Sequence, residues 1–224
     1  MGMHIGLIAA KVPVDELRKA FLRTWNEYEI KASDTVDDDG DLWDWKAAHE
    51  VFVSEANWSP TNRGTTVFAF RQDGDWAIMM DWSYVLAMDH EKLPVLSGHV
   101  GTVVTLVVES ASGSAYFSCY EGGQLRREIN NADGEVTFKG RPLPEENGLD
   151  IDRFYMEESE ALWKALGLSP LDRIPTQGLR AVCVVDRTDF SRSSPVAAAG
   201  GGASPVPPAQ AASPGPKRPW WKFW

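Results

Sequence analysis

The chain has 224 residues, with 22 lysines and arginines against 32 aspartates and glutamates, so its formal net charge is −10. Three of the cations, Lys217, Arg218 and Lys222, lie after residue 194, so the preceding part carries 19 cations against 32 carboxylates, a balance of −13. Binding a polyanion requires a positively charged surface, and this balance therefore excludes nucleic acid as a partner of the main body. No stretch reaches the roughly 18 apolar residues of a transmembrane helix, and no signal peptide is recognisable, so we expect a cytoplasmic protein.

The first 30 residues predict a strand followed by a helix. Residues 3–10 form an apolar run typical of a strand. Pro13, whose fixed φ suits a first helical turn, precedes apolar residues at helical spacing such as Leu17 and Phe21. We therefore expect an amphipathic helix over residues 13–28.

The acidic run 34–41 indicates an exposed loop, because adjacent carboxylates repel each other and Gly40 interrupts any periodicity. A calcium loop needs oxygen ligands at its first and twelfth positions when a glycine is sixth. With Gly40 as the sixth residue, Thr35 is first and Lys46 is twelfth, so both ends fail. We predict a solvated loop and no calcium site.

The middle of the chain, from about 50 to 138, predicts an antiparallel meander of short strands separated by glycine turns. The turn signals are Asp73-Gly74, Ser112-Gly113, Gly122-Gly123 and Asp133-Gly134. Side chains alternate over 115–120, so one face of that strand should pack on a core and the other should be wetter. The predicted strands are 67–71, 76–80, 103–108, 115–120, 125–129 and 136–138.

The third quarter of the chain returns to helical spacing, which predicts a helix over 151–166 that ends at Gly167. Asp150 or Asp152 is expected to cap this helix. A closing strand should follow at 180–186. The expected fold class is thus α+β, an antiparallel sheet with two principal helices, within one globular domain that spans residues 1–194.

Two cysteines, Cys119 and Cys183, lie inside apolar runs without a neighbouring cysteine or histidine, and we expect buried thiols. The histidines His4, His49, His90 and His99 have no zinc-binding spacing, and no glycine-rich phosphate loop is present. The sequence accordingly predicts neither a metal nor a cofactor.

Residues 195–216 contain almost only Ala, Gly, Pro, Ser and Val, which predicts a flexible, disordered linker because nothing in it offsets the entropy cost of ordering. The motif at 217–224 follows, with four large aromatics and three cations. We interpret it as a docking peptide for a protein partner, because aromatic side chains anchor well per area buried. Its predicted contact residues are Lys217, Arg218, Trp220, Trp221, Lys222, Phe223 and Trp224.

Two other uses of the motif at 217–224 remain open. It could lie at an anionic membrane surface, as in a peripheral membrane protein, or fold back on its own acidic domain. Trp43 and Trp45, beside Asp41 and Asp44, are either core residues or a partly exposed recognition surface.

The leading expectation is a non-enzymatic cytosolic binding or adaptor protein that combines an acidic domain with this docking peptide. The alternative is a hydrolase or transferase of unknown substrate, with a pocket near Asp81, Asp89, His90 and His99. That alternative requires these four side chains to converge.

Overall fold

The structure, a computed structural model, describes residues 4–37, 39–49, 51, 64–171 and 178–188. The predicted linker at 195–216 and the motif at 217–224 lie outside the described residues. Across the described part of the chain, helices pack on an antiparallel sheet, so the predicted α+β class is confirmed.

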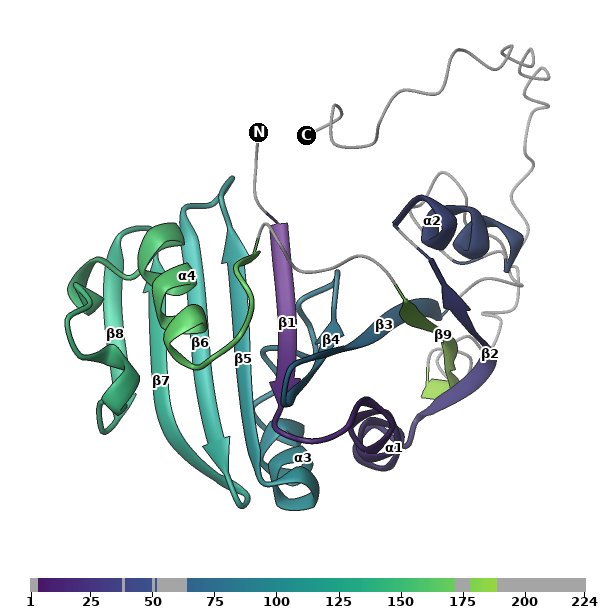
Figure 1. The fold of residues 1–224 in the computed structure, drawn as a ribbon, viewed down its shortest axis with the longest axis horizontal. Helices are drawn as coiled ribbons and strands as arrows, with labels where there is room; N and C mark the ends of the chain where they lie inside the picture. The colour runs from purple at the N-terminus through teal and green to yellow at the C-terminus, as the bar shows by residue number, and fades with distance from the viewer. Residues whose placement is uncertain (1–3, 38, 50, 52–63, 172–177, 189–224) are drawn as a thin grey trace, which may run out of the picture.

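The described strands form one nine-stranded sheet in which neighbouring strands run antiparallel (Figure 1). The strand order is β2-β9-β3-β4-β1-β5-β6-β7-β8, and β5 to β8 form the predicted meander. The first strand therefore lies at the centre, and the last is inserted between β2 and β3. The strands are β1 His4–Ala10, β2 Tyr28–Val36, β3 Thr65–Asp73, β4 Trp76–Met80, β5 Thr102–Glu109, β6 Ser114–Glu121, β7 Gln124–Ala132, β8 Glu135–Gly140 and β9 Leu179–Asp186.

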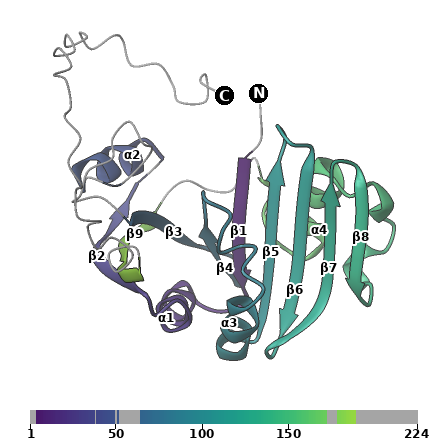
Figure 2. The ribbon, with the colours of Figure 1, turned by 180° about the vertical axis from the view of Figure 1, so that it is seen from behind.

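Helices cover both faces of the sheet. Helices α1 and α3 lie on one face, as Figure 2 shows from behind, and α4 and α2 lie on the other. The helices are α1 Val14–Thr24, α2 Asp39–Ala48, α3 Lys92–Val100 and α4 Met156–Ala165, with short 3-10 turns η2 Pro144–Glu146 and η3 Ile151–Arg153.

Strand β6 shows how the two faces are used. Phe117 and Cys119 pack beneath α4, in the cluster that contains Trp163. Tyr116 and Tyr120 point to the other face and pack with the residues of α1 and α3. The expectation that one face of this strand would be wetter is therefore wrong, because α3, a helix absent from the sequence interpretation, covers it.

The N-terminal third departs from the sequence prediction in two places. Helix α1 ends at Thr24, and Tyr28 begins β2, although its ring still lies 6.0 Å from that of Phe21. The acidic run is not a loop throughout: Asp34 pairs with Ala181 of β9, and α2 starts at Asp39. Residues 28–36 form a strand because they pair with β9, which lies far away in the sequence and gives no local signal.

Other boundaries agree more closely. The β3–β4 hairpin closes with Asp73 opposite Trp76, and Gly74 takes the left-handed φ of +57° that the turn requires. The prediction that Asp150 or Asp152 caps the helix is wrong, because α4 begins at Met156. There the Glu158 carboxylate accepts a 3.3 Å hydrogen bond from the Tyr155 backbone N–H.

Both cysteines are free and buried, as predicted. Burial raises the pKa of the Cys119 thiol to about 11, and burial also raises the pKa of Cys183. Within the described part of the chain, no helix has the length and apolar character needed to cross a bilayer.

Candidate functional site

Asp81, one of the four candidate catalytic residues, organises a turn. Its side chain is only 1% exposed. The carboxylate accepts hydrogen bonds from Ser83 (backbone N–H 3.0 Å, hydroxyl 2.6 Å) and from the backbone N–H groups of Leu86 (2.9 Å) and Ala87 (3.1 Å). The turn presses on β1 at Gly6, where an added Cβ would lie 2.3 Å from the Asp81 carbonyl oxygen. The carboxylate oxygens of Asp81 are thus occupied by groups of the turn itself.

Asp89 has a similar structural role. Its carboxylate accepts hydrogen bonds from the backbone N–H groups of Glu91 (3.1 Å) and Lys92 (3.0 Å), at the start of α3. It also accepts a 3.0 Å bond from the indole N–H of Trp25, which follows α1. Asp89 therefore joins the two helices that cover this face of the sheet.

The two histidines of the candidate set lie at opposite ends of α3. His90 precedes the helix and the exposed His99 lies in its last turn. The nine-residue helix is roughly 13 Å long at about 1.5 Å per residue. The structure therefore does not assemble the four candidate residues around one point. Within the described ranges, no group of three or more acidic, histidine or cysteine side chains has the geometry to hold a metal ion.

His90 instead meets residues that the sequence interpretation missed. Its Nδ1 atom lies 3.7 Å from a carboxylate oxygen of Glu128 and 3.4 Å from the hydroxyl oxygens of Tyr116 and Tyr120. Glu128 is 8% exposed at its side chain and pairs with the Lys139 ammonium at 2.8 Å. These five residues form a polar cluster, which we call the His90 cluster, where the start of α3 approaches β6 and β7 and where Lys139 reaches in from β8.

The His90 cluster extends into the protein through hydroxyl groups. The Tyr116 hydroxyl donates to Glu128 at 3.4 Å, and the buried hydroxyls of Thr105 and Ser118 lie 2.6 Å apart beneath the two tyrosines. Burial raises the pKa of both Tyr116 and Tyr120, so the phenols remain protonated donors near neutral pH. The arrangement can hold the imidazole in a fixed orientation, with about half of its side chain, 53%, in solvent.

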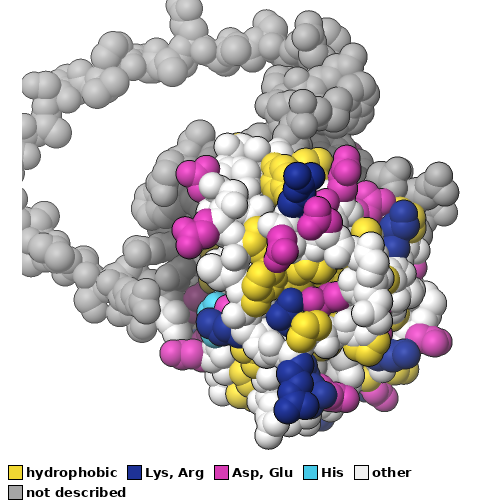
Figure 3. All heavy atoms as spheres, turned by 90° about the vertical axis from the view of Figure 1, so that its left-hand side faces the viewer, with side chains coloured by type: hydrophobic (Ala, Val, Ile, Leu, Met, Phe, Trp, Pro, Cys, Tyr) yellow, Lys and Arg dark blue, Asp and Glu magenta, His cyan; other side chains and the backbone are white. Residues whose placement is uncertain are grey.

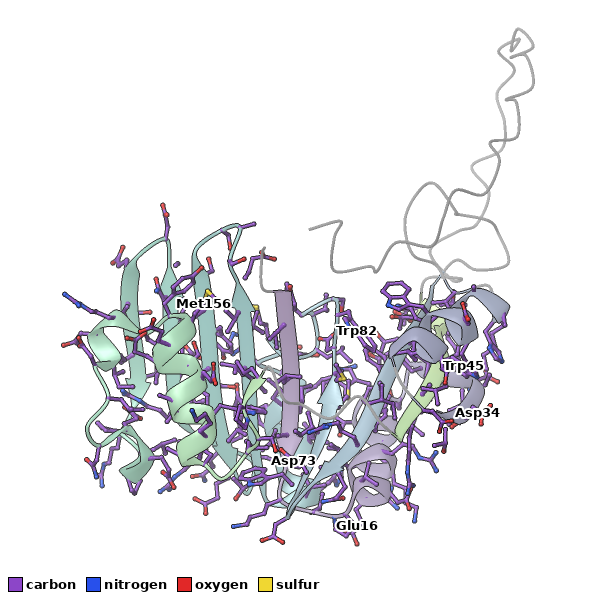
Figure 4. The ribbon with its side chains drawn as sticks, turned by 45° about the horizontal axis from the view of Figure 1, so that its top comes forward. Glu16, Asp34, Trp45, Asp73, Trp82 and Met156 are labelled. Carbon is purple, nitrogen blue, oxygen red and sulfur yellow. The ribbon has the colours of Figure 1, made fainter. Side chains whose placement is uncertain are left out.

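A second group of side chains surrounds Lys46 on α2. The Lys46 ammonium lies 4.1 Å from the ring centroid of Trp43 and 5.0 Å from that of Trp82, within cation–π range of both. Burial lowers the pKa of Lys46. Figure 4 shows Trp45 on α2 and Trp82 just beyond β4, and both pack against the hydrophobic cluster beneath α2. The ring of Trp45 also lies 4.2 Å from that of His49.

Trp43 remains 41% exposed, unlike the partly buried Trp45 and Trp82. Exposed carboxylates lie around this end of the molecule, on α2 and on the neighbouring end of β2; Asp34, on the α2 side of β2, is labelled in Figure 4. We call this the acidic–aromatic surface, and its members are Asp34, Asp37, Asp41, Trp43 and Asp44. The sequence left open whether these two tryptophans are core or surface residues. The structure places Trp43 at the surface and packs Trp45 against a core.

The seven predicted partner-binding residues, Lys217 to Trp224 without Pro219, lie outside the described residues. No protein-family model matches the chain, and no curated protein or solved structure matches it either.

Proposed function

We propose that this chain is a cytosolic, non-enzymatic binding protein whose C-terminal motif docks into a groove of a protein partner. The observation that carries the proposal is the composition of residues 217–224, in which four large aromatics and three cations follow 22 residues that carry no charge. Such a motif offers rigid anchors at its tip, and its linker gives it reach.

An energetic estimate favours reversible binding. Four buried aromatics, at about 150–250 Å² each, contribute roughly 15–25 kcal/mol as an upper bound. Ordering eight residues costs on the order of 12 kcal/mol, before the entropy of association is included. The remainder of roughly 3–13 kcal/mol, from which the cost of association is still to be subtracted, favours reversible docking over permanent anchoring.

The described domain supports a binding role over the hydrolase or transferase alternative. Asp81 and Asp89 hold backbone amides, and His99 lies at the far end of α3 from His90. A catalytic set would need these groups to face one reacting position.

The proposal is tested by affinity capture with the intact chain, a chain lacking residues 217–224, and a chain in which the four aromatics of the motif are replaced by alanine. Both altered chains should lose the same captured protein, while their melting temperatures stay at that of the intact chain. The alanine variant keeps all three cations, so it separates aromatic anchoring from charge. Retained capture by both variants would overturn the proposal, and co-flotation of the intact chain with anionic vesicles would favour a membrane surface instead.

A further inference from the structure

We propose that the outer edge of β8 pairs with the same edge of a second copy of this chain, so that two nine-stranded sheets join into one across a two-fold axis. This contact uses residues 135–139 of the described domain and does not depend on the motif at 217–224. In the register that we assign, Thr137 of one copy lies opposite Thr137 of the other.

Strand β8 leaves one of its edges open. It is the last strand of the sheet and has a hydrogen-bonded neighbour, β7, on one side only (Figure 1). The segment 141–155 turns back toward α4, and its hydrogen bonds run within itself, to β7 or to α4; within the described residues, none reaches the outer edge of β8. Figure 3 looks at this side of the molecule and shows apolar side chains at the surface among cationic and acidic ones. An open edge presents N–H and C=O groups that can pair with another strand.

The hairpin between β7 and β8 determines which backbone groups of β8 point outward. Its two-residue turn, Asp133-Gly134, has both residues at positive φ (53° and 85°), and it places Ala132 opposite Glu135. In such a hairpin the closing pair exchanges hydrogen bonds, and bonded and non-bonded pairs then alternate along the ladder. Glu135 and every second residue after it therefore bond inward to β7. The N–H and C=O groups of Val136 and Phe138 point away from the sheet.

These outward groups limit how two copies of β8 can pair. A two-fold axis perpendicular to the sheet makes the two strands antiparallel, and residues that bond across it must both have outward groups. Pairing Val136 with Phe138 of the second copy satisfies this condition twice, around a central Thr137–Thr137 pair. A register centred on Val136 or on Phe138 would instead need Gly134 or Gly140 in a bonded pair, and both glycines have a left-handed φ (85° and 79°) that no regular strand uses.

The side chains are complementary on both faces of the joined sheet. On the α3 face, Glu135 of each copy lies opposite Lys139 of the other, which gives two cross-strand ion pairs. Lys139 already pairs with Glu128 of its own chain at 2.8 Å, so its ammonium would lie between two carboxylates. On the α4 face, Val136 lies opposite Phe138, which is 41% exposed in the single copy and which the second strand would cover.

The charged residue on this edge selects a register and does not prevent pairing. A lysine on an edge strand often serves to block edge-to-edge association. Here the antiparallel register places each Lys139 against a carboxylate of the other copy. The opposite edge of the sheet, β2, is less suited to pairing, because a bulge between Ile30 and Ala32 interrupts its ladder with β9. We therefore assign the contact between copies to β8.

Sedimentation of the intact chain tests the association. Five residues a side make a small interface, so we expect a reversible dimer with a Kd on the order of 10–100 µM. Glu135→Lys sets like charges opposite each other in both cross-strand pairs and should weaken the Kd about tenfold. Asp44→Lys makes the same charge change on the exposed face of α2 and should leave the Kd unchanged.

Three sedimentation results would overturn the proposal. The first is a monomer at every concentration up to about ten times the expected Kd. The second is an equal loss of association in the two charge variants. The third is a dimer that disappears when residues 217–224 are removed, which would assign the association to the motif.

Engineered cysteines test the register. In Thr137→Cys the two new thiols face each other in a non-hydrogen-bonded pair, whose Cα atoms lie about 4.5 Å apart, within reach of a disulfide. Glu135→Cys is the matched control: it is equally exposed, but its counterpart lies four residues further along the ladder, about 14 Å away. The native cysteines are free and buried, so they do not compete.

Under mild oxidation, Thr137→Cys should form a covalent dimer about tenfold faster than Glu135→Cys, while both variants keep the melting temperature of the intact chain. Equal rates for the two variants would show that the copies meet without this register. Absence of a covalent dimer in Thr137→Cys, at a concentration where sedimentation shows association, would place the contact elsewhere. Either result would reject pairing through β8.

Discussion

The turn that begins at Asp81 and helix α2 are both rich in aspartate and aromatic residues, yet they use their carboxylates in opposite ways. Asp81 and Asp89 accept hydrogen bonds from backbone N–H groups that follow them by two to six residues. Asp44 lies inside α2, where amide groups bond to the preceding helical turn, and it is exposed. The comparison teaches that local backbone geometry, not residue type, decides whether an acidic group serves the fold or remains exposed to solvent.

The strongest test of this contrast is Asp81→Ala against Asp44→Ala. Removing the Asp81 carboxylate leaves the buried N–H groups of Leu86 and Ala87 without their acceptor. We expect the free energy of unfolding to fall by about 4 kcal/mol and the melting temperature by about 10 °C. Asp44→Ala should change the free energy by less than about 0.5 kcal/mol. Equal losses in chemical denaturation would contradict the distinction.

The same contrast extends to ion pairs. The Arg127 guanidinium and the Glu146 carboxylate lie 2.7 Å apart, and both side chains are 6% exposed. Glu146→Ala leaves a buried charge uncompensated, and we expect a loss of about 3 kcal/mol in the free energy of unfolding. Glu29→Ala, which breaks the exposed pair with Arg187, serves as the control and should cost less than about 1 kcal/mol. Urea denaturation of the two variants measures the difference.

The buried thiol of Cys119 extends the comparison of buried and exposed groups to alkaline pH, without any mutation. Burial raises the pKa of Cys119 from 9.0 to about 11, so the folded state retains its proton while the unfolded state loses it. The stabilisation is complete below pH 9 and disappears as the pH rises toward 11, by on the order of 2–3 kcal/mol. Raised pKa values of Tyr116 and Tyr120 act in the same direction at higher pH. Thermal unfolding at pH 8 and pH 10.5 should show this loss, and a constant melting temperature would contradict it.

The smallest expected effect concerns Lys46. Lys46→Met keeps the length of the side chain but removes the cation that lies over Trp43 and Trp82. We expect a decrease of about 0.5–1 kcal/mol in the free energy of unfolding. Lys46→Arg should recover most of it, because a guanidinium also stacks on indole rings. Failure of arginine to recover stability would show that packing of the lysine stem, rather than its charge, is what matters.

Strands with glycine turns were predictable from sequence, because the alternation and the turn chemistry are both local. Helices α2 and α3 were not: α2 contains Gly40, and α3 carries Pro94 and Gly98, so their local helix signals are weak. Burial against the sheet, seen at Leu42 and Leu96, offsets that weakness. Long-range contacts with the sheet, rather than local sequence, thus determine that α2 and α3 form helices.

The candidate sites were less predictable than the fold. Glu128 reaches His90 only because it lies opposite Ser118 in the β6–β7 pair, beneath a helix that the sequence did not indicate. The arrangement of Trp43 and Trp82 around Lys46 likewise depends on α2 lying over the sheet. Residues 36 or more apart in the chain, such as Lys46 and Trp82 or His90 and Glu128, carry no spacing signal. The tryptophans among aspartates were a local hint of a partly exposed surface, and Trp43 is indeed exposed.

The position of β9 has a consequence for biosynthesis. Because β9 is inserted between β2 and β3, a nascent chain that ends before Leu179 contains two strands whose edges lack their shared neighbour. Unpaired edges of this kind template misassociation between chains. The domain therefore cannot close its sheet until almost all of it has been translated, and a stalled or truncated product should be far more prone to aggregate than the finished chain.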